Sequence, residues 1–355
     1  MKLATVFSGI GSIETAVSRV YGKENREIVF ACDTGEREID KTKEEINEFT
    51  KNMTEEDKQK YITRLFYGKG RTNFVKKSYV ANYKIKDDQW FEDIRFINGN
   101  LFKNKVDLFV GGSPCQSFSV IGKRAGLEDA RGTLFYDFAR LITEIQPKVF
   151  LYENVPGMMS HDDGKTWRHI QEIFDSLGYK IFKSVLNAAD FEIPQNRKRL
   201  YVVGFKDKDV EFKFPKPKKL KTTLYDYLDE CVDDKYYFKK KGFEFVTSNP
   251  HRARINRLTI QTQKANQQYN WNGDFVFEKL DLNKHRSAIE KGAYVGVYKG
   301  EEGLLRKLTP NECFKLMGFN DFVNVVPDMH AYRQAGNSIV VDVLVEILKK
   351  IKEVV

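Results

Sequence analysis

The 355-residue sequence has no apolar run near the length of about 18 residues that a membrane-spanning helix requires. Its opening stretch, MKLATVFSGIGSIETAV, is broken by glycines and Glu14 and lacks the cleavage pattern of a signal peptide. Cysteine is scarce, and the four cysteines form no C-x-x-C pair: Cys32, Cys115, Cys231 and Cys313. We therefore expect no metal site, no disulfide framework and no membrane association, which fits a protein of the reducing cytoplasm.

Positive charge exceeds negative charge, with 59 lysines and arginines against 50 aspartates and glutamates and a formal net charge of +9. Such a surplus suits a polyanionic partner, although many basic proteins have no such partner. The contents of 41% hydrophobic and 31% charged residues are those of an ordinary globular protein. This length allows one large domain with a smaller one beside it.

Apolar strand patterns alternate with helix patterns in the first 212 residues. The strands are expected in KLATVF, EIVFACD, VDLFV, KVFLYENV and RLYVVGF. Helices are expected in SIETAVSRVYG, TLFYDFARLITEIQP and TWRHIQEIFDSLGY. This order predicts an α/β fold with a doubly wound, mostly parallel sheet in a domain over residues 1–212.

Two parts of the chain depart from this alternation. Residues 35–95 form a charged insertion with two helix patterns, and Thr54 is the expected N-cap between them. After a Pro/Lys linker, residues 222–305 are rich in aromatic, basic and amide side chains. We expect a second, smaller domain with its hinge over residues 213–330. Residues 331–355 then return to the large domain as an amphipathic helix.

Cys115 stands in the polar stretch GGSPCQSFS, directly after the strand pattern VDLFV. Structural cysteines usually lie among apolar neighbours, whereas this one follows a proline at the expected carboxyl end of a strand. Ligands of open α/β sheets bind at that edge. The position favours a nucleophilic thiol, and a thiol that merely caps the strand is the alternative.

Other strand ends carry groups suited to ligands. The segment FSGIGS opens a helix, whose N-terminus favours negative charge. Asp33 ends the second strand, where such folds bind ribose hydroxyls. Glu153 ends another apolar strand, where partial burial would raise its pKa and suit proton donation; a solvated strand-end acid is the alternative. Three residues in PQNRKRLYVV alternate along the chain and are expected on one face: Gln195, Arg197 and Arg199.

Together these motifs resemble those of the DNA cytosine-C5 methyltransferases of bacterial restriction–modification type. The matching segments, in the family's order, are FSGIGS, GSPCQSFS, RGTLF, ENV, QNRKR, RKLTPNECFKLMGF and QAGNSIVVDV. The resemblance covers nearly all of the chain outside 35–95 and about 222–300. It implies the Rossmann-like class I methyltransferase fold with a target-recognition domain, S-adenosylmethionine as cofactor and double-stranded DNA as partner. It also implies a monomer and a cognate restriction endonuclease as a separate protein.

The resemblance implies a role for each matching residue. Cys115 would attack C6 of a flipped-out cytosine, Glu153 would contact N3 and the amine, and Arg197 and Arg199 would hold the base and the acid. The cofactor, released as S-adenosylhomocysteine, is assigned to Phe7, Gly9, Ile10, Gly11, Asp33, Thr34, Asn100, Leu101, Pro114, Asn337 and Ser338. Contacts with DNA are expected at Gln116, Ser119, Ile121, Arg131, Arg252, Arg254, Arg257, Gln261 and Gln263, the last five because arginine and amide groups read base edges.

The sequence departs from the family pattern at the cofactor. Thr34 follows Asp33 where an aromatic residue commonly stacks on adenine, and Asn100 replaces the usual aspartate. The family's recognition-domain Thr-Leu pair is best matched by LTIQT at 258–262. Three alternatives stay open: a tRNA cytosine-C5 methyltransferase, a Rossmann oxidoreductase with a structural cysteine, and an inactive DNA-binding regulator.

Overall fold

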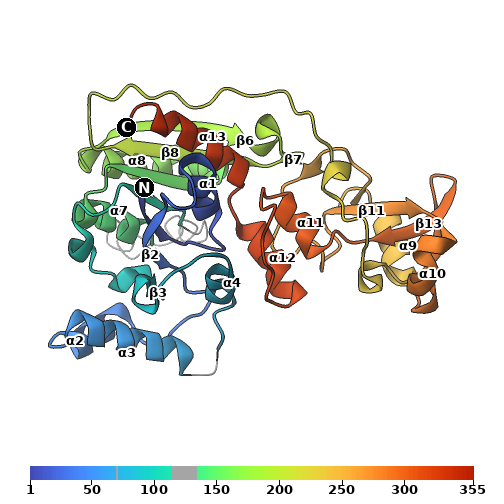
Figure 1. Ribbon diagram of the computed structural model, residues 1–355, viewed down its shortest axis with the longest axis horizontal. Helices are drawn as coiled ribbons and strands as arrows, with labels where there is room; N and C mark the ends of the chain where they lie inside the picture. Colours follow the sequence, from blue (N-terminus) through green and yellow to red (C-terminus); the bar gives the residue numbers. More distant parts are fainter. Residues whose placement is uncertain (69–70, 114–133) are drawn as a thin grey trace. The chain divides into compact units, whose positions relative to one another are not determined.

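The computed structural model describes residues 1–68, 71–113 and 134–355, and the chain divides into two compact units (Figure 1). The first unit consists of Met1–Leu186, Lys198–Lys216 and Leu344–Val355. The second consists of Asn187–Arg197 and Pro217–Val343. The units change at Lys216 and at Val343, where the sequence analysis expected boundaries at 212 and 330. Residues 187–197 join the second unit because Gln195 and Arg197 make their hydrogen bonds there.

The first unit is built on a seven-stranded sheet in the order β3-β2-β1-β4-β5-β8-β6. The strands are β1 (Lys2–Val6), β2 (Glu27–Cys32), β3 (Trp90–Phe91), β4 (Leu108–Gly111), β5 (Val149–Asn154), β6 (Lys180–Asn187) and β8 (Lys198–Phe205). The pairs from β3 to β5 are parallel, and β5 pairs antiparallel with β8. This confirms the predicted mostly parallel α/β sheet. The strand order reverses at β1 and β4, and ligands bind outside the carboxyl ends of strands at such a switch point.

Helices with one apolar face cover this sheet. They are α1 (Ser12–Tyr21), α7 (Leu134–Ile145), α8 (Lys165–Ser176) and α13 (Val341–Lys352), joined by the short helices η1 (Asp87–Gln89), η2 (Ile94–Phe96), η3 (Gly99–Phe102), η4 (Pro156–Met159) and η5 (His161–Gly164). The apolar residues of α7 recur at three- and four-residue spacing and enter the main core. The predicted C-terminal helix is present. Its Lys352 Nζ donates to Val20 O at 3.0 Å, and Leu344–Val355 belong to the first unit.

The charged segment 35–95 contains two different structures. The two predicted helices exist as α2 (Lys43–Thr50) and α3 (Glu55–Tyr67), with Thr54 capping α3 as expected. They lie side by side in Figure 1 and share a small cluster made by Ile46, Ile62, Phe66 and Phe96. The sequence did not predict α4 (Phe74–Asn82) or β3. The helix α4 connects β2 to β3 and packs on the sheet domain, so the insertion proper is the pair α2–α3.

The second unit has short strands and its own cores. Its four-stranded sheet has the order β12-β13-β11-β9, and β7 pairs with β10. The strands are β7 (Gln195–Asn196), β9 (Arg254–Ile255), β10 (Ile260–Gln261), β11 (Asp274–Lys279), β12 (Val295–Tyr298) and β13 (Glu301–Arg306). The helices are η6 (Ala188–Phe191), η7 (Leu224–Tyr227), η8 (Asp234–Tyr236), α9 (Lys240–Ser248), α10 (Leu282–Glu290), α11 (Pro310–Lys315) and α12 (Asp328–Asn337). Among the described residues, no helix has the length and apolar character needed to cross a membrane.

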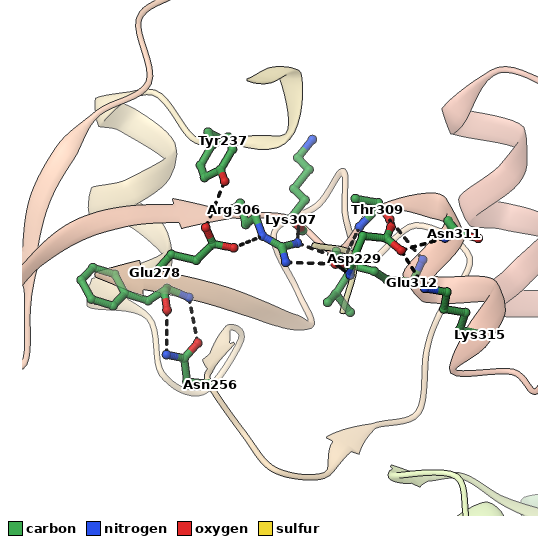
Figure 2. Close-up of polar contacts among 12 residues, drawn as sticks. Asp229, Tyr237, Asn256, Glu278, Arg306, Lys307, Thr309, Asn311, Glu312 and Lys315 are labelled. Atoms are coloured by element: carbon green, nitrogen blue, oxygen red, sulfur yellow. Dashed lines mark hydrogen bonds and ion pairs between the residues drawn. The ribbon is translucent and has the colours of Figure 1, made fainter. Parts of the chain in front are cut away.

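A buried ionic network joins β11, β13 and α11 of the second unit (Figure 2). The Arg306 guanidinium, 1% exposed, donates to Glu278 at 2.6 Å and to both oxygens of Glu312 at 2.9 Å. Burial alone would raise the pKa of Glu278, but hydrogen bonds from Lys284, Arg306 and His285 outweigh it and lower the pKa to about 2. The network is fully paired, as buried charges must be, and it serves the scaffold of this unit.

Candidate active site

The backbone of the turn between β1 and α1 leaves open space beside Gly9. Phe7 and Gly9 both have φ of 54°, and a Cβ on Gly9 would meet nothing within 4 Å. Gly11, at φ 85°, has no room for a side chain because the ring of Tyr83 occupies the place of its Cβ. Ile10 between them is buried. The turn therefore presents main chain at Gly9 and packs firmly at Gly11.

Asp33 follows β2 at the same edge of the sheet and faces this turn. Its carboxylate accepts hydrogen bonds from Gly9 N at 2.9 Å and from Gly35 N at 2.8 Å. Burial raises the pKa of Asp33, and the two N–H groups oppose that rise in part. Both oxygens keep further lone pairs. The carboxylate can thus accept hydrogen bonds from a pair of hydroxyls. The neighbouring Thr34 accepts a hydrogen bond from Arg37 through its carbonyl.

Glu153 and Arg199 meet on adjacent antiparallel strands. Arg199 Nε lies 3.1 Å from Glu153 Oε1, and both side chains are mostly buried, at 15% and 13% exposure. A side-chain carbon on Gly112 would lie 3.2 Å from Glu153 Oε2. Asn154 Nδ2 also donates to Ser113 O at 3.0 Å. The acid therefore lies against the start of the segment that leads to the predicted nucleophile.

Several predicted site residues fall in 114–133, outside the described residues. These are Pro114, Cys115, Gln116, Ser119, Ile121 and Arg131. Their roles stay predictions.

Arg197 has different contacts from Arg199, with which the sequence predicted it to share a face. The Arg197 N–H donates to Gln195 O at 3.0 Å in a tight turn between β7 and β8. Arg197 belongs to the second unit and is 4% exposed. Its guanidinium donates hydrogen bonds to the carbonyls of Gln263, Gly336 and Ser338. Gln195 is fully buried and donates to Leu316 O at 2.9 Å. These are scaffold contacts.

The remaining predicted cofactor residues have different surroundings. Ser338 is buried at the end of α12 and donates to Gln334 O, whereas the neighbouring Asn337 is exposed. Asn100 and Leu101 lie exposed in η3. Asp93 is a strand-end acid that the sequence analysis did not single out. It follows β3 and is 4% exposed, and the two acids after the apolar pair in WFED could have indicated it. Its carboxylate accepts hydrogen bonds from Arg95.

The predicted base-reading residues separate into exposed and buried groups. Arg252, Arg257 and Gln261 are exposed, and Arg254 is half-buried. Gln263 is buried: it is 2% exposed, and its amide donates to Cys313 O at 3.1 Å. Its role in reading bases stays a prediction.

The model of the C-5 cytosine-specific DNA methylase family matches residues 1–353. The chain is 35% identical to the type II methyltransferase M1.ScrFI of Lactococcus lactis subsp. cremoris, over 79% of this chain and 70% of that protein. It is 37% identical to M.Bsp6I of Bacillus sp. (strain RFL6), over 77% of this chain and 86% of that protein. The solved structure of the Entamoeba histolytica methyltransferase EhMeth has a similar fold, with a TM-score of 0.69 at 17% identity, covering 99% of this chain and 98% of that one.

Proposed function

The chain belongs to the C-5 cytosine-specific DNA methylase family, and from that premise we propose that it methylates a flipped-out cytosine in a specific duplex sequence, with Cys115 as nucleophile. The family confirms the predicted DNA cytosine methyltransferase, and it implies the use of S-adenosylmethionine. One observation carries the mechanistic proposal. The Glu153–Arg199 pair lies against Gly112, where the segment containing Cys115 begins.

The residues at the β1 and β2 ends fit the cofactor. The open space at Gly9 would receive it close to the main chain, and the Asp33 carboxylate would accept hydrogen bonds from its ribose hydroxyls. Phe7 would lie along the same turn, and Asn337 and Ser338 would hold the methionine end, as the family resemblance implies. When bound, S-adenosylmethionine supplies a methyl group on a positively charged sulfur, which makes that methyl electrophilic.

The protein groups prepare cytosine for methylation. The Cys115 thiolate forms a bond to C6, and the electron pair of the C5–C6 double bond makes C5 nucleophilic. With its carboxyl group protonated, Glu153 donates a hydrogen bond or that proton to N3 and stabilises the charge that this addition places on the ring. Arg199 holds the carboxyl group of Glu153 in place. Once C5 carries its methyl group, loss of the C5 proton re-forms the double bond and expels the Cys115 sulfur.

The second unit would recognise the DNA sequence. Arg252, Arg257 and Gln261 are exposed and have the donors and acceptors that major-groove base edges require. Because stacking hides C6 in a duplex, the target base must leave the helix before Cys115 attacks it. We propose double-stranded DNA as substrate, a monomer as the acting species, and a separate cognate endonuclease.

The direct test compares Cys115→Ser with Cys231→Ser. Cys231 is an exposed thiol and provides a matched control. We expect Cys115→Ser to abolish methyl transfer to duplex DNA, because an alcohol is a far weaker nucleophile than a thiolate, and Cys231→Ser to retain it. Bisulfite sequencing of a random-sequence plasmid reports the methylated site, with tRNA as a parallel substrate. Turnover by Cys115→Ser, or methylation of tRNA alone, would refute the proposal.

A further inference from the structure

The inserted pair α2–α3 lies in the sequence between Asp33 and the crossover helix α4. A parallel connection from β2 to β3 needs only the one helix, which α4 provides. The pair has its own small apolar cluster and adds nothing to the sheet. Some of its polar contacts with the rest of the first unit reach Asp137 and Phe96, and one set, made through Arg37, reaches the backbone next to Asp33.

Arg37 is the first part of this connection. It is 7% exposed, and its Nε donates to Thr34 O at 2.8 Å. Nη1 lies 3.4 Å from the carbonyl of Phe66, near the end of α3, and 3.4 Å from that of Arg71. The guanidinium also lies over the ring of Tyr67, 4.8 Å from its centroid. The Arg37 guanidinium thus connects the end of the inserted pair to Thr34, the residue after Asp33.

Glu92 and Asn73 complete the connection. Glu92, 2% exposed, forms an ion pair with Arg37. Asn73 Nδ2 donates to Asp33 O at 3.0 Å and to Glu92 Oε2 at 3.2 Å, while its Oδ1 accepts from Lys76 N and caps α4. The amide of Asn73 also fills the place where Gly35 would carry a Cβ. Gly35 N in turn donates to the Asp33 carboxylate.

We propose that Arg37, Glu92 and Asn73 form a clamp through which the inserted helices position the Asp33 carboxylate for the ribose hydroxyls of the cofactor. The inference rests on the proposed function, because Asp33 must be the ribose-binding group. The three are positioning residues that act through the Asp33–Gly35 turn. Replacement of one of the three residues leaves a buried charge or polar group of the others unpaired. The Asp33–Gly35 turn is then no longer held in one conformation.

The experiment measures ligand discrimination by the full-length protein. Calorimetry compares S-adenosylhomocysteine with its analogue that lacks both ribose hydroxyls. Asn73→Ser retains a capping oxygen for α4 but is too short to reach Asp33 O. Arg37→Lys retains the charge opposite Glu92 but lacks the guanidinium fork. We expect each variant to lose affinity for S-adenosylhomocysteine by about tenfold and to bind the analogue within about twofold of wild type. At saturating cofactor, kcat should change little.

Two control variants remove other contacts between the inserted helices and the rest of the first unit. Lys43→Met removes the ion pair between α2 and Asp137, at 3.2 Å, and Gln59→Ala removes the hydrogen bond from α3 to Phe96 O, at 3.0 Å. Both should keep the wild-type discrimination between the two ligands. Thermal melting of every variant, with and without ligand, identifies any that do not fold.

The outcomes separate the clamp from the proposed function. Unchanged discrimination in folded Asn73→Ser and Arg37→Lys overturns the clamp alone. Equal loss in Lys43→Met and Gln59→Ala also overturns it, since general loosening would then explain the result. If wild type binds neither ligand, or prefers the analogue, the assignment of Asp33 fails and the clamp fails with it.

Discussion

Both units bury polar side chains, but the chemistry left to those side chains differs. In the first unit, Asp33 follows β2 and Glu153 ends β5, two strands of the parallel part of the sheet, where Asp33 accepts from Gly9 N and Glu153 lies close to Gly112. In the second unit, Gln263 and Arg306 use their polar groups on main-chain carbonyls and carboxylates of the same unit. In the proposed function, these buried polar groups of the first unit serve the active site, whereas those of the second unit hold its scaffold together.

The difference follows from architecture. A parallel sheet brings strand ends that are far apart in sequence to one edge, so polar residues there meet without having to hold the fold together. The second unit has strands as short as two residues, such as β9 and β10, and small apolar clusters. Hydrogen bonds from buried side chains supply the connections that longer strands would make. In the proposed function, the side chains of this unit that contact DNA bases must then come from exposed positions.

The largest effects are expected from two arginines that stand two residues apart. Arg199→Met leaves Glu153 without its cation, so we expect turnover to fall on the order of 10²-fold with little change in melting temperature. Arg197→Met leaves three buried carbonyls without a donor and should destabilise the protein by about 3 kcal/mol or more. Single-turnover methylation and urea unfolding measure the two effects.

One outcome would contradict the assignment of Arg199 to the reaction and Arg197 to the scaffold. If folded Arg197→Met loses its chemical rate as Arg199→Met does, the contrast between reactive and scaffold polarity disappears at this strand. Arg199→Lys tests the fork geometry, because an ammonium keeps the charge next to Glu153 without the planar donors.

A second prediction concerns Asp274, a carboxyl at the start of β11. Burial raises its pKa to about 6, and a hydrogen bond from Gln261 N opposes the rise only in part. An unfolded chain loses this proton near the ordinary value of 3.8. Between these values the folded state holds a proton that the unfolded state has lost, so rising pH favours unfolding. The loss across the window is about 3 kcal/mol.

Asp274→Asn stays neutral and should lack this loss. We expect it to gain about 2 kcal/mol over wild type as the pH rises from about 4 to about 7. Urea unfolding followed by Trp271 fluorescence, with Trp90 and Trp167 replaced by Phe, reports on the second unit. Asp321→Asn, at an exposed position, is the control. A parallel pH course for wild type and Asp274→Asn would show that this carboxyl is ionised in the fold.

The sequence predicted most of the sheet because each buried strand is an apolar run closed by glycine or an acid. It missed α4, β3 and β6. The residues that α4 buries, Ser78 and Tyr79, make no apolar stripe, and β3 has two residues. Their places are set by contacts with β2 and by the cluster around Trp90. Such partners are distant in sequence and leave no local pattern.

The same limit applies to the site. The ends of β1, β2 and β5 were predictable, since strand ends share an edge whatever the rest of the chain does. The burial of Gln263 was not, because its partners Gln195 and Cys313 stand far away in the sequence. The burial of Arg197 was not predictable either, because the carbonyls that it contacts, those of Gln263, Gly336 and Ser338, lie far away in the sequence.

The smallest effects should come from the exposed residues of the second unit, and they test where the DNA sequence is read. Arg257→Ala or Gln261→Ala should each cost about 1–3 kcal/mol in binding to the preferred site and relax the preference at one base pair. Lys239→Ala, at an exposed lysine, should weaken binding to all sequences alike and reduce its salt dependence, because phosphate contacts carry no sequence information. Gln263→Ala should lower stability and leave the preferred sequence unchanged. Affinity measured against a panel of single-base variants of the site separates these results. If Gln263→Ala changes the preferred base while Arg257→Ala and Gln261→Ala do not, the buried amide takes part in readout, and the exposed face is only solvated surface.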